Sequence, residues 1–326
     1  MSADVFPHPR QIDLAELGQL RAKLTPVPGP VRITHVVNPF PATPGSEHDR
    51  AQKVSLATMD RARRVAAVTD PDVKVRHVAA VLSGEAPEEA GRFDEVLTLG
   101  RSVLDLKTFA HPRPLPLIHD ILTAPDLPDD EILIYTNADI ALTDGFYGFV
   151  ARLLRDGFDA IIINRRDIAN GWTGPDDIAI MSAEVGRSHS GADCFAFRAG
   201  LRKRFEPWSG CLGIPHVMRP LCHNMLVSAE SPCMLLDAHV TFHIGSDASW
   251  RNSKYNDYRA HNLAEADRVF DLMHADPARL ARLLSALRLD RNVVALSPSQ
   301  RRRLGLVPPP PLWRRVARRA KRLAGV

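Results

Sequence analysis

The stretch Glu131-Ile132-Leu133-Ile134-Tyr135-Thr136-Asn137-Ala138-Asp139-Ile140 decides the fold of this chain. Its apolar run, 132–135, predicts a buried strand. Asn137 and Asp139 follow where this strand ends, and their spacing points two oxygen-bearing side chains the same way. Such oxygens suit a hard divalent cation that also binds the phosphates of a ligand. A strand end followed by a helix N-cap, which also favours Asn and Asp, is the alternative interpretation.

Predicted strands and helices alternate around this stretch. Strands are expected at 31–38, 73–81, 132–135 and 160–164, and helices at 13–23, 47–67, 115–123 and 144–156. This alternation predicts an α/β fold built from βαβ units. This alternation of strands and helices stops after Asn164. Beyond it, strands are expected at 193–198, 233–236 and 240–243, and a helical region, interrupted near Pro277, at 256–288.

Length and composition place the chain among ordinary globular proteins. Its 326 residues allow one large domain or two small ones, and 45% of them are hydrophobic and 25% charged. The N-terminus lacks the apolar segment of a signal peptide, and no apolar run approaches the roughly 20 residues of a membrane span. The four cysteines are too far apart for a CxxC site, which favours buried thiols in a reducing cytoplasm.

The net charge of +4 conceals an asymmetry along the chain. Ten cations and no acids follow Asp290, so the rest of the chain carries 32 basic against 38 acidic residues. The pI of 9.0 is therefore a property of the C-terminal end. A nucleic-acid partner is disfavoured, because its basic footprint should lie on the folded domain.

The C-terminal end itself predicts a separate segment. We divide the chain into a domain at 1–290 and a basic, Pro-containing linker with an amphipathic tail at 291–326. In the tail, apolar residues at 312, 313, 316, 320 and 323 fall on one helical face, with arginines opposite. This pattern fits an interfacial anchor on an anionic membrane surface, and a disordered charged tail is the alternative.

Polar residues follow several of the predicted strands at their carboxyl ends. These residues are Asn38, Asn137 with Asp139, and Asn164 with Arg165 and Arg166. Ligands of open α/β sheets bind outside the carboxyl ends of the strands. The sequence therefore predicts that a binding site forms where these side chains meet.

Several stretches together resemble a bacterial group of GT-A-type, nucleotide-sugar-dependent glycosyltransferases. They are 135–140, 159–168, 189–195 and 241–245 with Trp250, and the likeness covers roughly residues 30–255. The resemblance implies a GT-A-like (Rossmann-like) mixed sheet flanked by helices, here with a helical C-terminal extension. The Asp-x-Asp signature of that family is reduced to Asn137-Ala138-Asp139 in this chain.

The resemblance also implies roles for single residues. Asp139 and His243 would bind a divalent metal, Mn²⁺ or Mg²⁺, on the donor diphosphate, and Asp193 would face the acceptor. His243, flanked by apolar residues, is alternatively a hydrogen-bonded core histidine. Asp193 has a physical argument of its own, because a carboxylate can remove the proton of an attacking sugar hydroxyl. Its alternative is an Asp that caps the turn into a strand.

Further candidates carry weaker signals. His189 and Trp250 are expected on the acceptor side, with a turn histidine and a hydrophobic contact as the alternatives. Arg165 and Arg166 suit phosphate, although an outward-facing Arg paired with Asp167 is the competing interpretation. The remaining candidates are Arg113, for phosphate or base, and Asn38, which could contact the nucleobase or form an Asn-Pro turn.

The predicted function is transfer of a sugar from a nucleotide diphosphate donor to a hydroxyl acceptor. The basic tail suggests a cell-envelope glycan or a lipid-linked acceptor, reached from the cytoplasm at the inner membrane face. A nucleotidyltransferase is one alternative, although residues 36–40 lack a Gly-rich phosphate loop. A non-catalytic sugar- or nucleotide-binding protein is another, and the amide at Asn137 is its best support.

Overall fold

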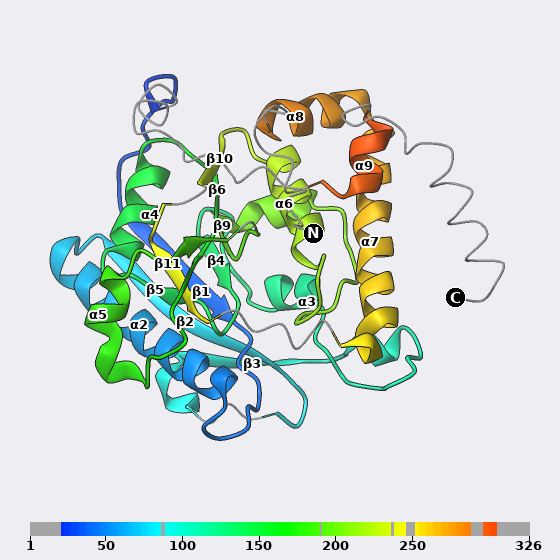
Figure 1. Ribbon diagram of the computed structural model, residues 1–326. Helices are drawn as coiled ribbons and strands as arrows, with labels where there is room; N and C mark the ends of the chain where they lie inside the picture. Colours follow the sequence, from blue (N-terminus) through cyan, green and yellow to red (C-terminus); the bar gives the residue numbers. More distant parts are fainter. Residues whose placement is uncertain are drawn as a thin grey trace.

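The computed structural model describes residues 21–85, 89–189, 191–235, 238–245, 252–287 and 296–304. A seven-stranded sheet in the order β10-β6-β9-β4-β1-β2-β3 lies at its centre (Figure 1). The strand β9 runs antiparallel to both of its neighbours, and the other pairs are parallel. The strands are β1 (Val31–Val37), β2 (Val73–Leu82), β3 (Glu95–Leu99), β4 (Ile132–Thr136), β6 (Ala160–Ile163), β9 (Cys194–Arg198) and β10 (Pro232–Leu235).

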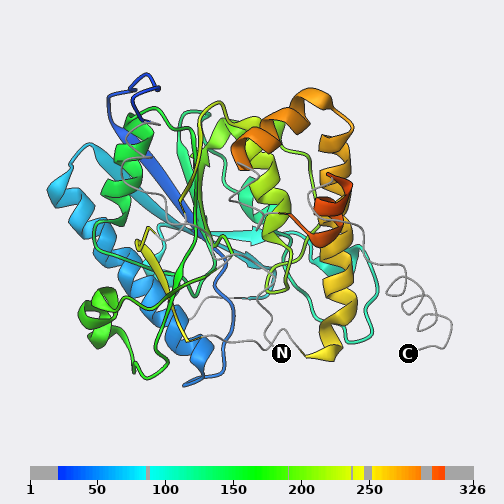
Figure 2. The same cartoon turned by 45° about the horizontal axis from the view of Figure 1, so that its top comes forward.

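Helices cover both faces of this sheet, as Figure 2 shows. One face packs against α2 (Glu47–Thr69) and α4 (Phe146–Arg155). The other face packs against α3 (Ile118–Thr123), α6 (Met218–Ser228), α7 (Asn256–His274) and α8 (Pro277–Leu287), with α9 (Pro298–Arg303) beside α7. Short 3-10 helices occupy Ala90–Arg92, Val103–Asp105, Pro175–Asp177, Ala199–Arg204 and Ser253–Tyr255.

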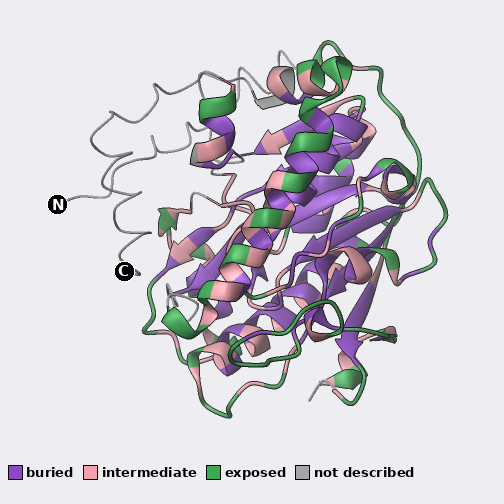
Figure 3. Ribbon diagram, turned by 90° about the vertical axis from the view of Figure 1, so that its right-hand side faces the viewer, coloured by how far each residue is buried: buried purple, intermediate pink, exposed green. Residues whose placement is uncertain are grey.

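The alternation of side chains in β4 explains these two layers. Leu133 and Tyr135 point into the core beneath α3 and α6, while Ile132 and Ile134 point into the core beneath α2 and α4. A strand that is buried on both faces is apolar along its length, which is why Ile132–Tyr135 contains no charged residue. Figure 3 shows the burial of the strands behind the helical side of the molecule.

A second, four-stranded sheet in the order β5-β11-β7-β8 lies beyond the carboxyl ends of the large sheet. Its strands are β5 (Ala141–Leu142), β7 (Arg166–Ile168), β8 (Arg187–Ser188) and β11 (Thr241–Ile244), and α5 (Ile178–Ala183) lies between β7 and β8 in the chain. The chain passes from β4 to β5 through Asn137–Ile140 and from β6 to β7 through Asn164 and Arg165. The small sheet therefore fixes the segments that carry the predicted site.

The predicted α/β class, with a mixed sheet flanked by helices, is confirmed. The structure adds β3 and α6, which the sequence pattern did not predict, and it inserts β9 antiparallel where βαβ units alone would give a parallel sheet. Residues 13–20 of the predicted helix at 13–23 and the whole tail at 312–323 lie outside the described residues. None of the described helices is long and apolar enough to span a membrane.

The predicted boundary at residue 290 separates α9 from the helices on which it packs. Leu296 is fully buried in the core, and the Gln300 side chain donates to the Ala266 carbonyl of α7 at 3.3 Å. We therefore propose that the domain continues to Leu304, and that a separate segment begins after it.

Candidate active site

Strand pairing brings the predicted site residues to one edge of the large sheet. β1, β4 and β6 run parallel to one another, so Asn38, Asn137 and Asn164 all follow carboxyl ends at this edge. The antiparallel β9 starts at the same edge, where Cys194 pairs with both Thr136 and Ile163. Asp193 therefore enters the site between the ends of β4 and β6.

Asp139 and His243 face each other across this edge. His243 Nε2 lies 3.3 Å from Asp139 Oδ2, and His243 Nδ1 donates to the Gly245 carbonyl at 3.1 Å. Burial alone would lower the pKa of His243, but the Asp139 carboxylate outweighs it and the pKa is raised. Burial would raise the pKa of Asp139, and His243 holds it below its usual range. The second oxygen, Asp139 Oδ1, is buried and accepts no hydrogen bond from the described residues.

Arg165 lies between two carboxylates. Its Nη1 donates to Asp193 Oδ1 at 3.1 Å, and its Nε donates to Asp167 Oδ1 at 2.8 Å. Asp193 is only 6% exposed, and burial alone would raise its pKa, but Arg165 and His189 hold the pKa well below the usual range. Asp193 is therefore an ionised carboxylate in a site where an unpaired charge would be costly.

His189 lies on the other side of Asp193. Its Nδ1 is 3.3 Å from Asp193 Oδ2, and the same nitrogen accepts a hydrogen bond from the Gly191 N–H at 3.0 Å. One nitrogen cannot accept from Gly191 and donate to Asp193 at once. With the bond from Gly191 made, Asp193 Oδ2 stays buried and without a hydrogen bond within the described part of the chain.

Gly191 has a steric reason to be glycine. A Cβ atom there would lie 2.8 Å from His189 Cε1, closer than packed atoms approach. The positive-φ glycines of the described chain do not include Gly191. The requirement is therefore the close approach of the His189 ring, which keeps the imidazole against Asp193.

Asn137 is held by the strand that precedes it. The Tyr135 hydroxyl donates to Asn137 Oδ1 at 3.0 Å. Burial raises the pKa of Tyr135 well above its usual value, with Asp139 and Asp193 adding to it, so the hydroxyl stays protonated and remains a donor. The amide oxygen that replaces a carboxylate oxygen in the motif is thus already in use.

The structure does not bring every predicted residue into this group. Asn38 is buried, and its Nδ2 donates to the Ala80 carbonyl at 2.6 Å, so it links β1 to β2. Arg166 points back into the fold, where its Nη2 donates to the Gly186 carbonyl at 3.1 Å. Arg113 contacts the Tyr255 hydroxyl at 3.2 Å, beside α7. Trp250 lies outside the described residues.

Three further residues shape the site, and the sequence pattern did not assign them to it. Asp167 orients Arg165, the Gly245 carbonyl orients His243, and Tyr135 orients Asn137. The signal for Asp167 was its position two residues after Arg165 on an extended segment, which places both side chains on one side. Nothing in the sequence signals the other two.

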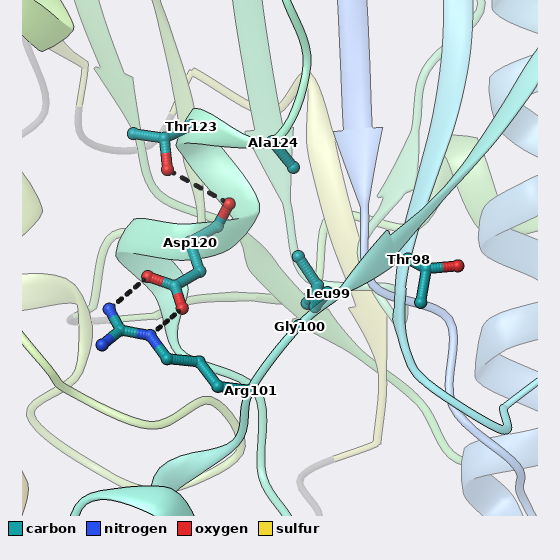
Figure 4. A pocket seen from close by; sticks show the side chains of 7 residues that line it. All are labelled: Thr98, Leu99, Gly100, Arg101, Asp120, Thr123 and Ala124. Carbon is teal, nitrogen blue, oxygen red and sulfur yellow. Dashed lines mark hydrogen bonds and ion pairs between the residues drawn. The ribbon is translucent and has the colours of Figure 1, made fainter.

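A shallow hollow lies along the same edge, at the carboxyl end of β3 (Figure 4). Its lining residues are Thr98, Leu99, Gly100, Arg101, Asp120, Thr123 and Ala124. Arg101 and Asp120 form a two-pronged ion pair on its wall, with Nε–Oδ2 2.7 Å and Nη2–Oδ1 2.9 Å. The hollow offers peptide groups, a hydroxyl and a charged pair to a polar ligand.

The donor set at Asp139 and His243 fits a divalent cation in part. One orphaned carboxylate oxygen and one imidazole nitrogen are suitable ligands for Mn²⁺ or Mg²⁺. Among the described residues, no group of three or more His, Cys, Asp or Glu side chains could hold a metal ion. The remaining ligands would therefore have to come from water and from the phosphates of a substrate.

No protein-family model matches the chain, and neither does any curated protein. Solved structures that match include TarS from S. aureus in complex with UDP-GlcNAc, at 8% identity over 81% of this chain and 82% of that one, with a TM-score of 0.38. Another is glucosyl-3-phosphoglycerate synthase from Mycobacterium tuberculosis in complex with phosphoglyceric acid, at 14% identity over 86% of both chains, with a TM-score of 0.36. At such scores we draw no functional conclusion from these likenesses.

Proposed function

We propose that this chain is a glycosyltransferase that moves a sugar from a nucleotide diphosphate donor to a hydroxyl acceptor. One observation supports it above the others. Two carboxylates, the half-buried Asp139 and the buried Asp193, meet at the carboxyl edge of the sheet, and each has one oxygen engaged and one buried oxygen without a donor among the described residues. A buried carboxylate oxygen without a donor is costly, so both oxygens favour a ligand.

On the donor side, Asp139 and His243 would hold a divalent cation. Such a cation, when bound, neutralises the negative charge that develops on the departing diphosphate. The bond from His243 Nδ1–H to the Gly245 carbonyl leaves Nε2 free of a proton in the neutral imidazole, which is the form that binds metal. The nucleoside would extend along the carboxyl ends of the neighbouring strands toward the hollow at Thr98–Gly100.

On the acceptor side, Asp193 Oδ2 would accept the hydrogen bond of the attacking hydroxyl. The ion pair with Arg165 makes Asp193 a weak base in the absence of substrate. A diphosphate would compete for the same guanidinium, because phosphate offers Arg two acceptor oxygens. Loss of the Arg165 contact would raise the pKa of Asp193 and strengthen it as the base when the donor is in place.

A cell-envelope glycan or a lipid-linked molecule remains the acceptor that we propose, reached at the inner membrane face. The support for it is the basic composition of the C-terminal end, where six of the cations follow Leu304. Attraction to an anionic membrane would place the site close to such an acceptor.

A donor-binding protein without transferase activity is the second candidate. It is favoured by the amide at Asn137 and by the pairing of Asp193 with Arg165. Incubating the chain with Mn²⁺ and a panel of nucleotide sugars, followed by separation of the products, distinguishes the two. Release of nucleoside diphosphate, including slow hydrolysis without an acceptor, supports the transferase. Binding of a nucleotide sugar with no release by either route would support the second candidate.

A further inference from the structure

A chain of buried polar side chains crosses the core between the large sheet and the helices α2 and α4. Its members are Thr136 of β4, His35 of β1, Tyr147 of α4, His77 of β2 and Asp60 of α2. The first four are at most 1% exposed, and the side chain of Asp60 is 14% exposed. The proposed function uses none of these residues, although Thr136 directly precedes Asn137.

The pairing of the strands explains why these side chains meet. His35 pairs with His77 on one neighbouring strand and with Ile134 on the other, and residues paired in this way face the same side of the sheet. Thr136 lies two residues after Ile134, so it shares that side. The helices α2 and α4 cover this side (Figure 2), and Tyr147 and Asp60 reach the same layer from them.

Each member of the chain lies close to the next. The Thr136 hydroxyl oxygen lies 2.9 Å from His35 Nε2, and the Tyr147 hydroxyl oxygen lies 2.8 Å from His35 Nδ1. The Tyr147 oxygen also lies 3.1 Å from His77 Nε2. His77 Nδ1 faces Asp60 Oδ1 at 3.6 Å, and this buried oxygen accepts no hydrogen bond from the described residues. Three hydrogen bonds and one longer contact therefore join the end of β4 to α2.

The Asp60 end of the chain carries a negative charge. Arg92 Nη1 donates to Asp60 Oδ2 at 2.6 Å, and Arg63 Nη2 lies 3.6 Å from Asp60 Oδ1. Burial alone would raise the pKa of Asp60, but His77 and Arg92 outweigh it and the pKa is lowered. Burial, with His77 adding to the effect, lowers the pKa of His35 well below its usual value, so this ring is uncharged at neutral pH.

The available hydrogen atoms leave two ways to order the chain when both rings are neutral. A neutral imidazole has one N–H and one bare nitrogen, and a hydroxyl has one hydrogen, so the direction of one bond fixes the others. In the first order, Thr136 donates to His35, and His35 donates to Tyr147. Tyr147 then donates to His77, whose Nδ1–H faces the Asp60 carboxylate. In the second order, every bond is reversed.

Both ends of the chain favour the first order. In the reversed order, the bare Nδ1 of His77 would face the Asp60 carboxylate, so two lone pairs would meet. At the other end, the hydrogen of the Thr136 hydroxyl would be left over, because the described residues offer it no acceptor besides His35. A buried hydroxyl without an acceptor is costly. The first order avoids both costs.

The bond between His35 and Thr136 also extends the link between two strands of the site. Backbone pairing of β1 with β4 ends at Val36 and Tyr135. The side-chain bond continues this link by one residue, to Thr136, and Asn137 follows directly. The turn that carries the candidate metal ligand therefore begins at a residue held by the chain.

We propose that ionised Asp60 orders this chain as far as His35 and Thr136. Through this order, His35 is a positioning residue that holds the turn after β4, with Asn137 and Asp139, in place. A buried polar network whose members are all satisfied makes the surrounding core rigid. The order of the chain does not depend on the reaction, whereas its effect on ligand binding rests on the proposed function.

The direct test locates the proton on the His35 ring by ¹⁵N NMR, in which a protonated ring nitrogen and a bare one give well-separated signals. We expect the proton on Nδ1 in the wild type at neutral pH. Asp60→Asn should move part of it to Nε2, because the charge at the end of the chain is lost. In a Tyr147→Phe background, Asp60→Asn should no longer change the His35 signals, because the chain is cut between the two residues.

A second measurement tests the positioning role. Tyr147→Phe removes one oxygen from the middle of the chain and lies outside the candidate site. We expect it to displace the backbone amide signals of Asn137 and Asp139, and to weaken Mn²⁺-dependent binding of a nucleoside diphosphate roughly 2- to 10-fold, as the loss of a hydrogen bond does. The matched control is Tyr258→Phe, which removes a buried hydroxyl that donates to the His111 carbonyl at 3.0 Å. It should leave both readouts unchanged.

Each part of the proposal has its own contrary result. A proton on His35 Nε2 in the wild type, or His35 signals that ignore Asp60→Asn, would overturn the order of the chain. Unchanged amide signals at 137–139 in a folded Tyr147→Phe protein, or the same displacement in Tyr258→Phe, would overturn the positioning role. If the wild type binds none of UDP, GDP and ADP with Mn²⁺ present, the proposed function has failed, and the NMR signals still decide both parts.

Discussion

His243 Nε2 lies 3.3 Å from Asp139 Oδ2, although His243 is on β11 and Asp139 lies in the turn between β4 and β5, in a distant part of the chain. The contact exists because β11 pairs with β5, which directly follows the Asn137–Ile140 turn. The Gly245 carbonyl fixes the imidazole from behind, and Asp139 keeps one oxygen free. Without a metal ion, a proton on His243 Nε2 can bridge to Asp139 Oδ2. A divalent cation bound between the two side chains would displace this proton.

The first prediction concerns the charge of this pair. Asp139→Asn should lower the pKa of His243, because the carboxylate that stabilises the imidazolium is lost. A titration of the histidine ring signals by NMR, in the wild type and the variant, measures this change. The same pKa in both proteins would show that Asp139 does not interact with His243 in solution.

The second prediction follows from the same pair and concerns stability. Because the pKa of folded His243 is raised above 6.5, the pair stabilises the fold fully below that value and less as pH rises through the folded pKa. The free energy of unfolding should therefore differ more between wild type and Asp139→Asn at about pH 6 than at about pH 9. Denaturant unfolding at both pH values provides the measurement. A difference that grows toward alkaline pH would contradict it.

The third prediction concerns Asp193. Asp193→Ala should lower turnover by roughly 10²- to 10⁴-fold, as the loss of a general base does, with little change in donor affinity. Turnover at saturating nucleotide sugar and donor affinity are measured separately. A variant that loses donor affinity and keeps its turnover would place Asp193 on the donor side.

The fourth prediction concerns Arg165, whose side chain is only 15% exposed. Arg165→Gln leaves the Asp167 and Asp193 carboxylates without their shared cation, and breaking a buried pair costs about 3–5 kcal/mol. We expect a loss of stability of that order at neutral pH, measured by denaturant unfolding. The loss should shrink in acid, where the carboxylates become protonated; Arg32→Gln, at the exposed pair with Asp130, is the control and should change little.

The fifth prediction concerns the C-terminal segment. Because α9 packs on α7, a protein that ends after Leu304 should fold and keep its activity on a soluble acceptor, whereas one that ends near residue 290 should lose stability. The longer truncate should also lose sedimentation with anionic vesicles at low salt, where each cation contributes on the order of 1 kcal/mol. Full-length protein that ignores such vesicles would rule out the membrane anchor.

The sequence predicts the large sheet well where its strands are apolar throughout. The runs at Ile132–Tyr135 and Ala160–Ile163 are buried on both faces, so hydrophobicity alone identifies them. β3 was missed because Glu95, Leu97 and their neighbours leave it only partly buried at the sheet edge. α6 was missed because Pro220 stands in its first turn and because residues 220–228 are all buried, so polar and apolar residues do not separate onto two faces.

The candidate site was predictable only in part, for a topological reason. The sequence shows that polar residues follow β1, β4 and β6, and parallel pairing brings the carboxyl ends of these strands to one edge of the sheet. The contact between Arg165 and Asp193 depends on β9 entering antiparallel between β4 and β6, which no local pattern encodes. Successive side chains at a strand end point in opposite directions, so Arg165 faces the site and Arg166 turns away from it. The sequence predicts these directions only once the bounds of the strand are known.

The most direct test of the proposed function is titration calorimetry of nucleoside diphosphates with and without Mn²⁺, on wild type and Asp139→Asn. We predict that the wild type binds one nucleoside diphosphate, that Mn²⁺ strengthens this binding, and that Asp139→Asn loses the Mn²⁺ effect while its thermal unfolding stays cooperative. Absence of binding to UDP, GDP and ADP by the wild type with Mn²⁺ present would contradict the account, as would an undiminished Mn²⁺ effect in Asp139→Asn.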